Sequence, residues 1–125
     1  MIHLDTNFLI RALVRGTPQD EMLRGWLRSG EKLAMSTIAW AELLCGPMET
    51  RHLDLATAFV SERIPFLEED SALAARLFNE SGRRRGTFAD CMIAATSLRS
   101  KARLATSNPS DFSRFEEAGL TLLTA

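Results

Sequence analysis

Residues 1–10 have the sequence MIHLDTNFLI, in which a short apolar segment runs directly into an acid and then into a helical pattern. We interpret Ile2–Leu4 as a buried strand and Phe8–Val14 as the helix that follows it. Ligands of open α/β sheets bind at the carboxyl ends of the strands, so Asp5 lies where such a sheet would have its binding or active site. Asp5 could also serve only as a helix cap, because Asp is a preferred N-cap residue. The positions of the later acids in the chain are needed to distinguish between these two roles.

Strand and helix patterns alternate along the rest of the chain. The further predicted strands cover residues 32–35, 64–67, 103–106 and 120–123. Helical spacing predicts helices around residues 22–27, 37–45, 53–60, 70–82, 87–98 and 109–115. Strands that alternate with helices indicate a mostly parallel sheet with helices on both faces. We therefore expect one domain, residues 1–125, with a three-layer α/β/α fold, and Pro65 suits an edge strand of that sheet.

Composition narrows the class of protein. Hydrophobic residues make up 46% and charged residues 25% of the 125 residues, which is typical of a globular domain and excludes a disordered chain. No apolar run is long enough to span a bilayer and no leader is apparent, so we expect a cytoplasmic protein. The two cysteines are far apart and support neither a zinc site nor a redox motif. A net charge of −1 argues against a strongly basic protein that coats nucleic acid.

Glu42 is the second acid of interest. Its neighbours at helical spacing are Ile38, Ala39, Cys45 and Gly46, so it is predicted to lie on a buried row of its helix. A buried glutamate is costly unless it is paired, hydrogen-bonded or bound to a cation. The alternative is an exposed position near the end of the helix.

Asp90 and the pair Asn108 and Asp111 complete the polar set. Asp90 lies in the first turn of its helix beside the apolar stripe, although an acid there also complements the helix dipole. Asn108 and Asp111 follow a predicted strand as Asp5 does, or they form only a capped turn. An α/β fold could bring all these positions together, and clustered carboxylates repel unless a cation or shared protons compensate. Oxygen-only ligands suit Mg²⁺ or Mn²⁺ rather than zinc.

Four segments together resemble a PIN domain, and within that group a small VapC-type toxin ribonuclease of a toxin–antitoxin pair. They are D-T-N after the first strand, S-T-I-A-W-A-E-L, T-F-A-D-C-M-I-A-A, and A-T-S-N-P-S-D-F after a late strand. Each motif is short, but their order and spacing cover essentially the whole chain.

The resemblance implies a role for each candidate residue. Asp5, Glu42 and Asp90 correspond to the three main acids of the family's metal site, with Asp5 and Asp90 as the direct ligands. Asn108 would lie nearest the metal at the fourth position, with Asp111 in support. Three further residues would orient carboxylates or phosphate, namely Thr6, Asn7 and Ser107.

The implied activity is Mg²⁺-dependent hydrolysis of RNA phosphodiesters, with Mn²⁺ as a possible substitute. Glu42 would position or deprotonate the attacking water. The resemblance also implies a homodimer and a small antitoxin that inserts a basic side chain or helix into the acidic groove. Arg83–Arg85 could contact the RNA backbone or the antitoxin, or remain solvated.

Other classes of protein fit less well. An aspartate-nucleophile phosphatase normally needs a second aspartate two residues after the first, where this chain has Asn7. A receiver domain needs a lysine after a late strand, whereas Lys101 precedes one. The main alternative is a non-catalytic RNA- or protein-binding module with a degenerate acidic site, because Asn108 carries no charge.

Overall fold

The computed structural model describes residues 1–125, and its centre is a five-stranded sheet with the order β3-β2-β1-β4-β5. The strands are β1 (Ile2–Leu4), β2 (Leu33–Ser36), β3 (Glu62–Ile64), β4 (Arg103–Thr106) and β5 (Leu122–Thr124). All neighbouring strands are parallel, so their carboxyl ends meet at one edge of the sheet. The first strand of the chain is the central one, which places the residue after it in the middle of that edge.

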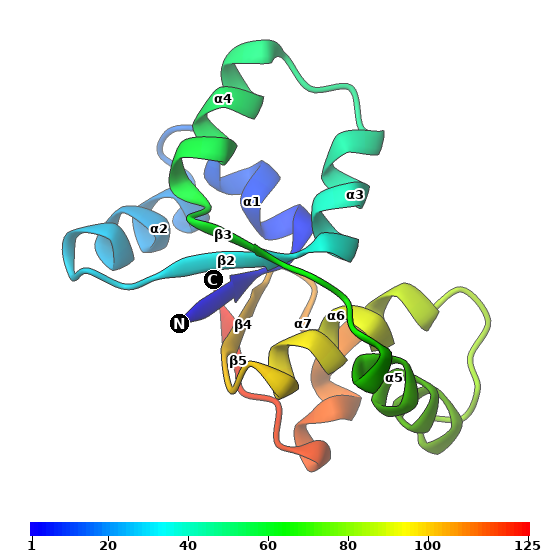
Figure 1. The fold of residues 1–125 in the computed structure, drawn as a ribbon. Coiled ribbons are helices and arrows are strands. Elements are labelled where there is room, and N and C mark those ends of the chain that lie inside the picture. Colours follow the sequence, from blue (N-terminus) through cyan, green and yellow to red (C-terminus); the bar gives the residue numbers. More distant parts are fainter.

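Helices cover both faces of the sheet (Figure 1). One face carries α1 (Thr6–Ala12), α2 (Pro18–Arg28), α3 (Thr37–Cys45) and α4 (Thr50–Phe59). The other carries α5 (Glu68–Glu80), α6 (Phe88–Arg99), α7 (Pro109–Phe112) and the 3₁₀ helix η1 (Ser113–Ala118). This arrangement confirms the predicted three-layer α/β/α fold. No helix combines the length and the apolar character that crossing a membrane requires.

The apolar core forms on both sides of the central strands. Ile2, Leu4 and Leu104 are fully buried, because helices cover both faces of a parallel sheet. Phe8 of α1 stacks on Trp26 of α2, with ring centroids 5.6 Å apart. Each fully buried large apolar side chain stabilises the fold by about 1.5–3 kcal/mol. The core therefore holds the carboxyl edge of the sheet in place.

Local caps set where the helices leave this edge. The Ser36 hydroxyl accepts a hydrogen bond from the backbone N–H of Ala39 at 3.1 Å, and α3 begins directly after β2. The Thr17 hydroxyl caps α2 in the same way, with Pro18 as the first helical residue. The start of α3 has the predicted position, whereas α2 begins at Pro18 and not near Met22 as predicted, because the capped first turn precedes the apolar spacing that indicated this helix.

Several predicted boundaries are wrong. The third strand covers residues 62–64 rather than 64–67, because its pairing with β2 ends at Ile64 and Pro65 has no N–H to continue it. α5 begins at Glu68, and Asp70 accepts a hydrogen bond from the backbone N–H of Leu67 at 2.9 Å. Thr87 precedes α6 as predicted, but its hydroxyl donates to the carbonyl of Arg84 instead of capping the helix.

Candidate active site

A cleft of about 230 Å³ opens at the carboxyl edge of the sheet and is lined almost entirely by polar side chains. Its walls come from the residues after β1, from α3, from the first turn of α6 and from the turn after β4. The lining residues are Asp5, Thr6, Asn7, Ile10, Glu42, Asp90, Asn108 and Asp111. Of the eight residues proposed from the sequence, the fold brings together all but Ser107.

Asp5 is buried at the centre of the cleft, with 6% of its surface exposed. One carboxylate oxygen accepts a hydrogen bond from the backbone N–H of Thr6 at 2.9 Å, and the other accepts one from the hydroxyl of Thr106 at 3.1 Å. The first of these bonds caps α1. The two roles considered for Asp5 are therefore compatible, since one side chain caps a helix and faces the cleft.

Glu42 is exposed, so the prediction that it lies on a buried row is wrong. Only Ala39 and Leu43 of α3 are fully buried, and Glu42 lies outside the narrow face that they define. The Thr6 hydroxyl is 3.2 Å from Oε1 of Glu42 and 3.0 Å from the carbonyl oxygen of Ala39, and it has one proton to donate between them. Thr6 thus contacts two acids, Asp5 through its backbone and Glu42 through its side chain.

Two acids of the cleft, Asp5 and Asp90, have a raised pKa. Burial raises the pKa of Asp5 to about 6, and the negative charges of Glu42 and Asp111 add to this, against the hydrogen bonds from Thr106 and Thr6. Burial also raises the pKa of Asp90 to about 6, followed by the charges of Asp111 and Asp5. None of these acids belongs to an ion pair. The cleft therefore concentrates negative charge without an ion-paired partner.

The turn after β4 supplies the last wall of the cleft. The backbone N–H of Asn108 donates to the Thr106 hydroxyl at 3.0 Å, and the N–H of Asp111 donates to the Asn108 carbonyl at 3.0 Å. Asn108 precedes α7, but its side chain makes no capping bond. The side chains of Asn108 and Asp111 are thus left to line the cleft.

Thr106, and not Ser107, is the hydroxyl residue at the end of β4 that contacts an acid of the cleft. Ser107 does not line the cleft, and its hydroxyl accepts a hydrogen bond from Gln19 at 3.3 Å. Thr106 was not proposed from the sequence, although it bridges Asp5 and the backbone of Asn108. The available signal was a hydroxyl at the last position of a strand, one residue before the polar turn.

The donor chemistry of the cleft fits a hard divalent cation. All its candidate ligands are carboxylate, amide or hydroxyl oxygens, and its acids lack a positive partner. However, no group of three or more His, Cys, Asp or Glu side chains is close enough to hold one metal ion. The acids line a common cleft, but no three carboxylates are close enough together to bind one metal ion.

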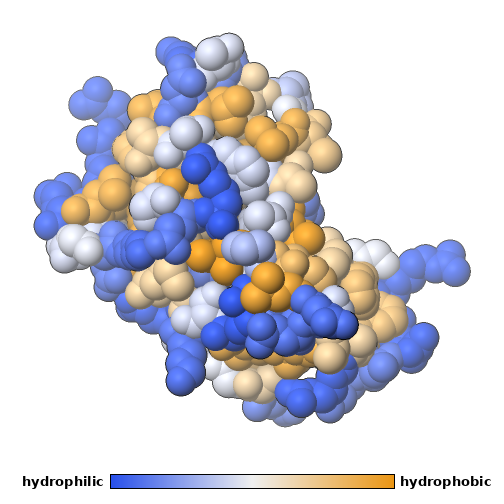
Figure 2. All heavy atoms as spheres, in the orientation of Figure 1, coloured by the Kyte–Doolittle hydropathy of each residue, from blue (hydrophilic) through white to orange (hydrophobic).

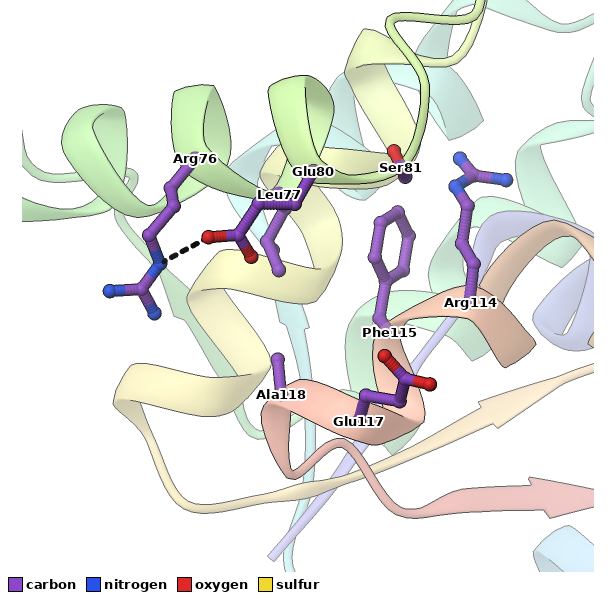
Figure 3. A pocket seen from close by; sticks show the side chains of 8 residues that line it. All are labelled: Arg76, Leu77, Glu80, Ser81, Arg114, Phe115, Glu117 and Ala118. Atoms are coloured by element: carbon purple, nitrogen blue, oxygen red, sulfur yellow. Dashed lines mark ion pairs between the residues drawn. The ribbon is translucent and has the colours of Figure 1, made fainter.

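A second cavity, of about 390 Å³, lies between the end of α5 and η1 (Figure 3). In the close-up, Arg114 and Phe115 extend side by side from η1 toward Ser81, and the guanidinium carbon is 4.4 Å from the Phe115 ring centre. Nε and Nη2 of Arg114 are buried without a hydrogen-bond partner. Its positive charge acts to lower the pKa of Asp90, so Arg114 is a basic neighbour of the site that sequence reasoning missed.

Comparison with known proteins agrees with this architecture. The PIN domain family model matches residues 2–118. The chain therefore belongs to the PIN domain family. No curated protein matches it in sequence.

Solved structures with the same fold include several toxin–antitoxin complexes. The VapBC2 complex of Rickettsia felis, bound to a DNA fragment from its promoter, has a TM-score of 0.77 at 22% identity and aligns over 100% of this chain and 99% of the other. VapBC-1 of nontypeable Haemophilus influenzae has a TM-score of 0.73 at 25% identity, over 99% and 98%. A toxin–antitoxin complex from Klebsiella pneumoniae has a TM-score of 0.74 at 23% identity, over 99% and 97%. The likeness to a VapC-type PIN domain, inferred from the sequence, is confirmed.

Proposed function

We propose that this chain is a Mg²⁺-dependent endoribonuclease that acts as the toxin of a toxin–antitoxin pair in the cytoplasm. The observation that carries the proposal is the cleft itself. Four separate segments of a PIN domain bring four acids and two asparagines to one edge of the sheet. Ligands of open α/β sheets bind at this edge.

Asp5 and Asp90 would hold the metal, with Glu42, Asn108 and Asp111 completing the site directly or through water. Bound Mg²⁺ supplies polarisation of a phosphate oxygen and lowers the pKa of a water molecule. The neutral Asn7 and Asn108 can donate hydrogen bonds to phosphate oxygens without adding repulsion. Their place in an acidic cleft is consistent with a polyanionic substrate.

Glu42 is the acid that we assign to accept a proton from the attacking water. Its side chain is exposed, so it can pass that proton on to solvent, whereas Asp5 is buried and hydrogen-bonded on both oxygens. The Thr6 hydroxyl lies 3.2 Å from Oε1 of Glu42 and can orient the carboxylate whenever its proton points to Glu42 rather than to the carbonyl of Ala39. Glu42 would then act as the general base.

The proposal is tested with end-labelled single-stranded RNA and a titration of Mg²⁺ or Mn²⁺. Cleavage should require the metal and stop with EDTA. Asp90→Asn should lower the rate by more than about 100-fold, because substitution of groups that merely support metal ligands already costs about 10–100-fold. Asp54→Asn on exposed α4 is the matched control and should cleave like the unmodified protein. Equal cleavage by Asp90→Asn would contradict the assignment.

One observation favours a second candidate, a binding module without catalysis. No three acidic side chains are close enough to share a metal ion. Thermal unfolding with and without Mg²⁺ separates the two candidates, because a ligand that binds the folded state raises Tm. A Mg²⁺-dependent rise that Asp5→Asn abolishes supports the enzyme. RNA binding with neither a rise nor cleavage supports the binding module.

The partner proposed for the inactive state is a small antitoxin. Three adjoining hollows of about 380, 410 and 310 Å³ run along α1, and Leu13 lines all three. Ile10, Val14 and Leu55 are exposed apolar residues of this surface, at 41%, 56% and 42%. Ile10 also lines the acidic cleft. We call these hollows the α1 groove, and they suit an amphipathic segment whose apolar face lies on α1 and whose basic end enters the cleft.

Homodimer formation, which the resemblance implies, is part of the proposal as well. Sedimentation equilibrium of the chain alone measures it directly. A single species with the mass of one chain, 13.9 kDa, would contradict it.

A further inference from the structure

The loop between α5 and α6 carries three consecutive arginines between two glycines, Gly82 and Gly86. We call residues 82–86 the arginine loop. Arg84 and Arg85 are exposed, and neither belongs to any of the ion pairs of the molecule. Half of the twelve other arginines and lysines belong to an ion pair, and no other stretch of the chain has three consecutive basic residues, so the loop is a local concentration of positive charge on a chain of net charge −1.

The backbone of the arginine loop is fixed on both sides. The N–H of Arg83 donates to the carbonyl of Phe78 at 3.0 Å, and the Arg83 guanidinium carbon is 5.4 Å from the Phe78 ring centre. The Arg83 side chain also bonds to Asn79. On the other side, the Thr87 hydroxyl donates to the carbonyl of Arg84 at 2.6 Å. Arg83 is thus tied back to α5, while the side chains of Arg84 and Arg85 extend freely from an anchored turn.

The arginine loop lies directly before the helix that holds Asp90. Four residues separate Arg85 from Asp90, and Asp90 is in the first turn of α6. Figure 1 shows the loop projecting beside the start of α6, on the opposite side of the sheet from α1 and α4. Figure 2 shows a hydrophilic protrusion at that edge of the molecule. The loop is therefore near one acid of the cleft and separated by the sheet from the α1 groove.

We propose that Arg84 and Arg85 bind phosphates of the RNA strand next to the one held in the cleft. The inference rests on the proposed function and extends it, because it assigns the residues that hold the substrate. The acidic cleft repels RNA until a metal is bound, so affinity must come from positive charge elsewhere. Guanidinium groups match phosphate oxygens with two parallel hydrogen bonds. An antitoxin lying along the α1 groove would not contact this loop.

The test measures binding of a 5′-labelled single-stranded RNA by fluorescence anisotropy, in EDTA and over a range of salt concentrations. The variant is Arg84→Gln with Arg85→Gln. The matched control is Arg28→Gln with Lys101→Gln, which removes the same charge at the ends of α2 and α6 that lead into β2 and β4, at the other edge of the sheet. Neither Arg28 nor Lys101 belongs to an ion pair.

The arginine-loop variant should bind about tenfold more weakly at low salt. Its plot of log K against log salt should be shallower by about 1.4, since each phosphate contact on a single strand contributes about 0.7. Circular dichroism should show both variants folded. An unchanged slope, or an equal loss in the control, would overturn the inference. So would an arginine-loop variant that loses only antitoxin binding.

Failure of the inference is distinguishable from failure of the proposed function. Binding in EDTA does not depend on cleavage, whereas Asp90→Asn tests cleavage alone. RNA binding through the loop without any metal-dependent cleavage would leave the inference standing and reject the nuclease. Metal-dependent cleavage together with RNA binding that does not depend on the loop would support the nuclease and reject the inference.

Discussion

At the scale of single residues, burial of the charged Asp5 carboxylate destabilises the fold, and its hydrogen bonds offset this effect only in part. Its pKa is raised from 3.8 to about 6, so its charged form destabilises the folded state. The stability that the raised pKa confers is complete below pH 3.8 and is lost as the pH rises through 6. At pH 7 the loss reaches about 3 kcal/mol. Asp5→Asn should therefore raise the free energy of unfolding at pH 7 while abolishing cleavage.

Urea unfolding at pH 7 and at pH 3.5 measures this effect. Asp5→Asn should gain up to about 3 kcal/mol at pH 7 and close to nothing at pH 3.5. The exposed Asp54→Asn should change little at either pH. A loss of stability at pH 7 would mean that the cap on α1 outweighs the cost of the buried charge.

His3 has the opposite dependence on pH. It is 1% exposed, its Nδ1 is 3.2 Å from the Ser97 hydroxyl, and its Nε2 has no partner. Burial lowers its pKa from 6.5 to about 4, with the positive charges of the N-terminus and Arg99 adding to this. The stability that His3 confers is complete above pH 6.5 and is lost as the pH falls toward 4. The loss should approach about 3 kcal/mol.

The two effects overlap, so each needs a difference measurement. Between pH 7 and pH 4, the free energy of unfolding of His3→Gln should fall less than that of the unmodified protein, or even rise as the pH is lowered. The reason is that protonation of Asp5 and Asp90 still stabilises the folded state of this variant. Unfolding free energies measured in parallel with the unmodified protein give the difference. Parallel curves for the two proteins would show that His3 titrates near its ordinary pKa.

Four residues show how far the site can be predicted from a single sequence. Asp5 could be identified because a strand end and a following helix are local patterns. Glu42 was placed on the correct helix but on the wrong face, because α3 buries only a narrow stripe. Thr106 and Arg114 depend on contacts with Asp5 and with α6, which are distant in sequence. Local pattern thus predicts the acids of the cleft but not the groups that orient them or modify their charge.

At the scale of elements, a buried ion pair joins α5 to α6. Asp70 is 1% exposed, and its carboxylate is 2.7 Å from Nε of Arg99. Arg99 also donates to the carbonyl of Pro65 at 2.9 Å, and Asp70 caps the start of α5. Asp70→Ala should cost about 3–5 kcal/mol, because it leaves a half-buried guanidinium without its partner.

Chemical denaturation measures the effect of Asp70→Ala, with the exposed neighbour Glu69→Gln as the control. The double variant Asp70→Ala with Arg99→Met should recover part of the loss, since it removes both charges together. A loss below about 1 kcal/mol in Asp70→Ala would indicate that water replaces the carboxylate.

The elements themselves were predicted unevenly. The helix at 37–45 and the strand at 103–106 have the predicted bounds, because Ser36 caps the first and buried apolar residues define the second. The third strand was displaced by two residues. It has three residues, all half-buried, and its limits come from pairing with β2 rather than from its own pattern. Short edge strands therefore remain beyond local reasoning.

At the scale of the whole molecule, the α1 groove and the acidic cleft form one continuous surface through Ile10. Val14→Asp should weaken antitoxin binding at least about tenfold, because it places a charge in the apolar groove. Cleavage of RNA by the free protein should be unchanged, since Val14 does not line the cleft.

Titration calorimetry with the antitoxin, together with the RNA cleavage assay, tests this prediction. Leu67→Asp is the matched control, because Leu67 is exposed at 38% but lies outside the groove. Equal weakening by both variants would point to general surface hydrophobicity rather than to a specific groove.

The order of the strands also determines when the cleft can exist during protein synthesis. β1 pairs on one side with β4, whose residues are made about a hundred positions later, and Asn108 and Asp111 follow β4. A nascent chain that has passed only Asp5 and Glu42 has two acids but no shared cleft. We expect the proposed nuclease activity to arise in one late step, when the chain emerges far enough from the ribosome for β4 to insert beside β1. A partner that binds promptly after release would then bind each chain as soon as its cleft has formed.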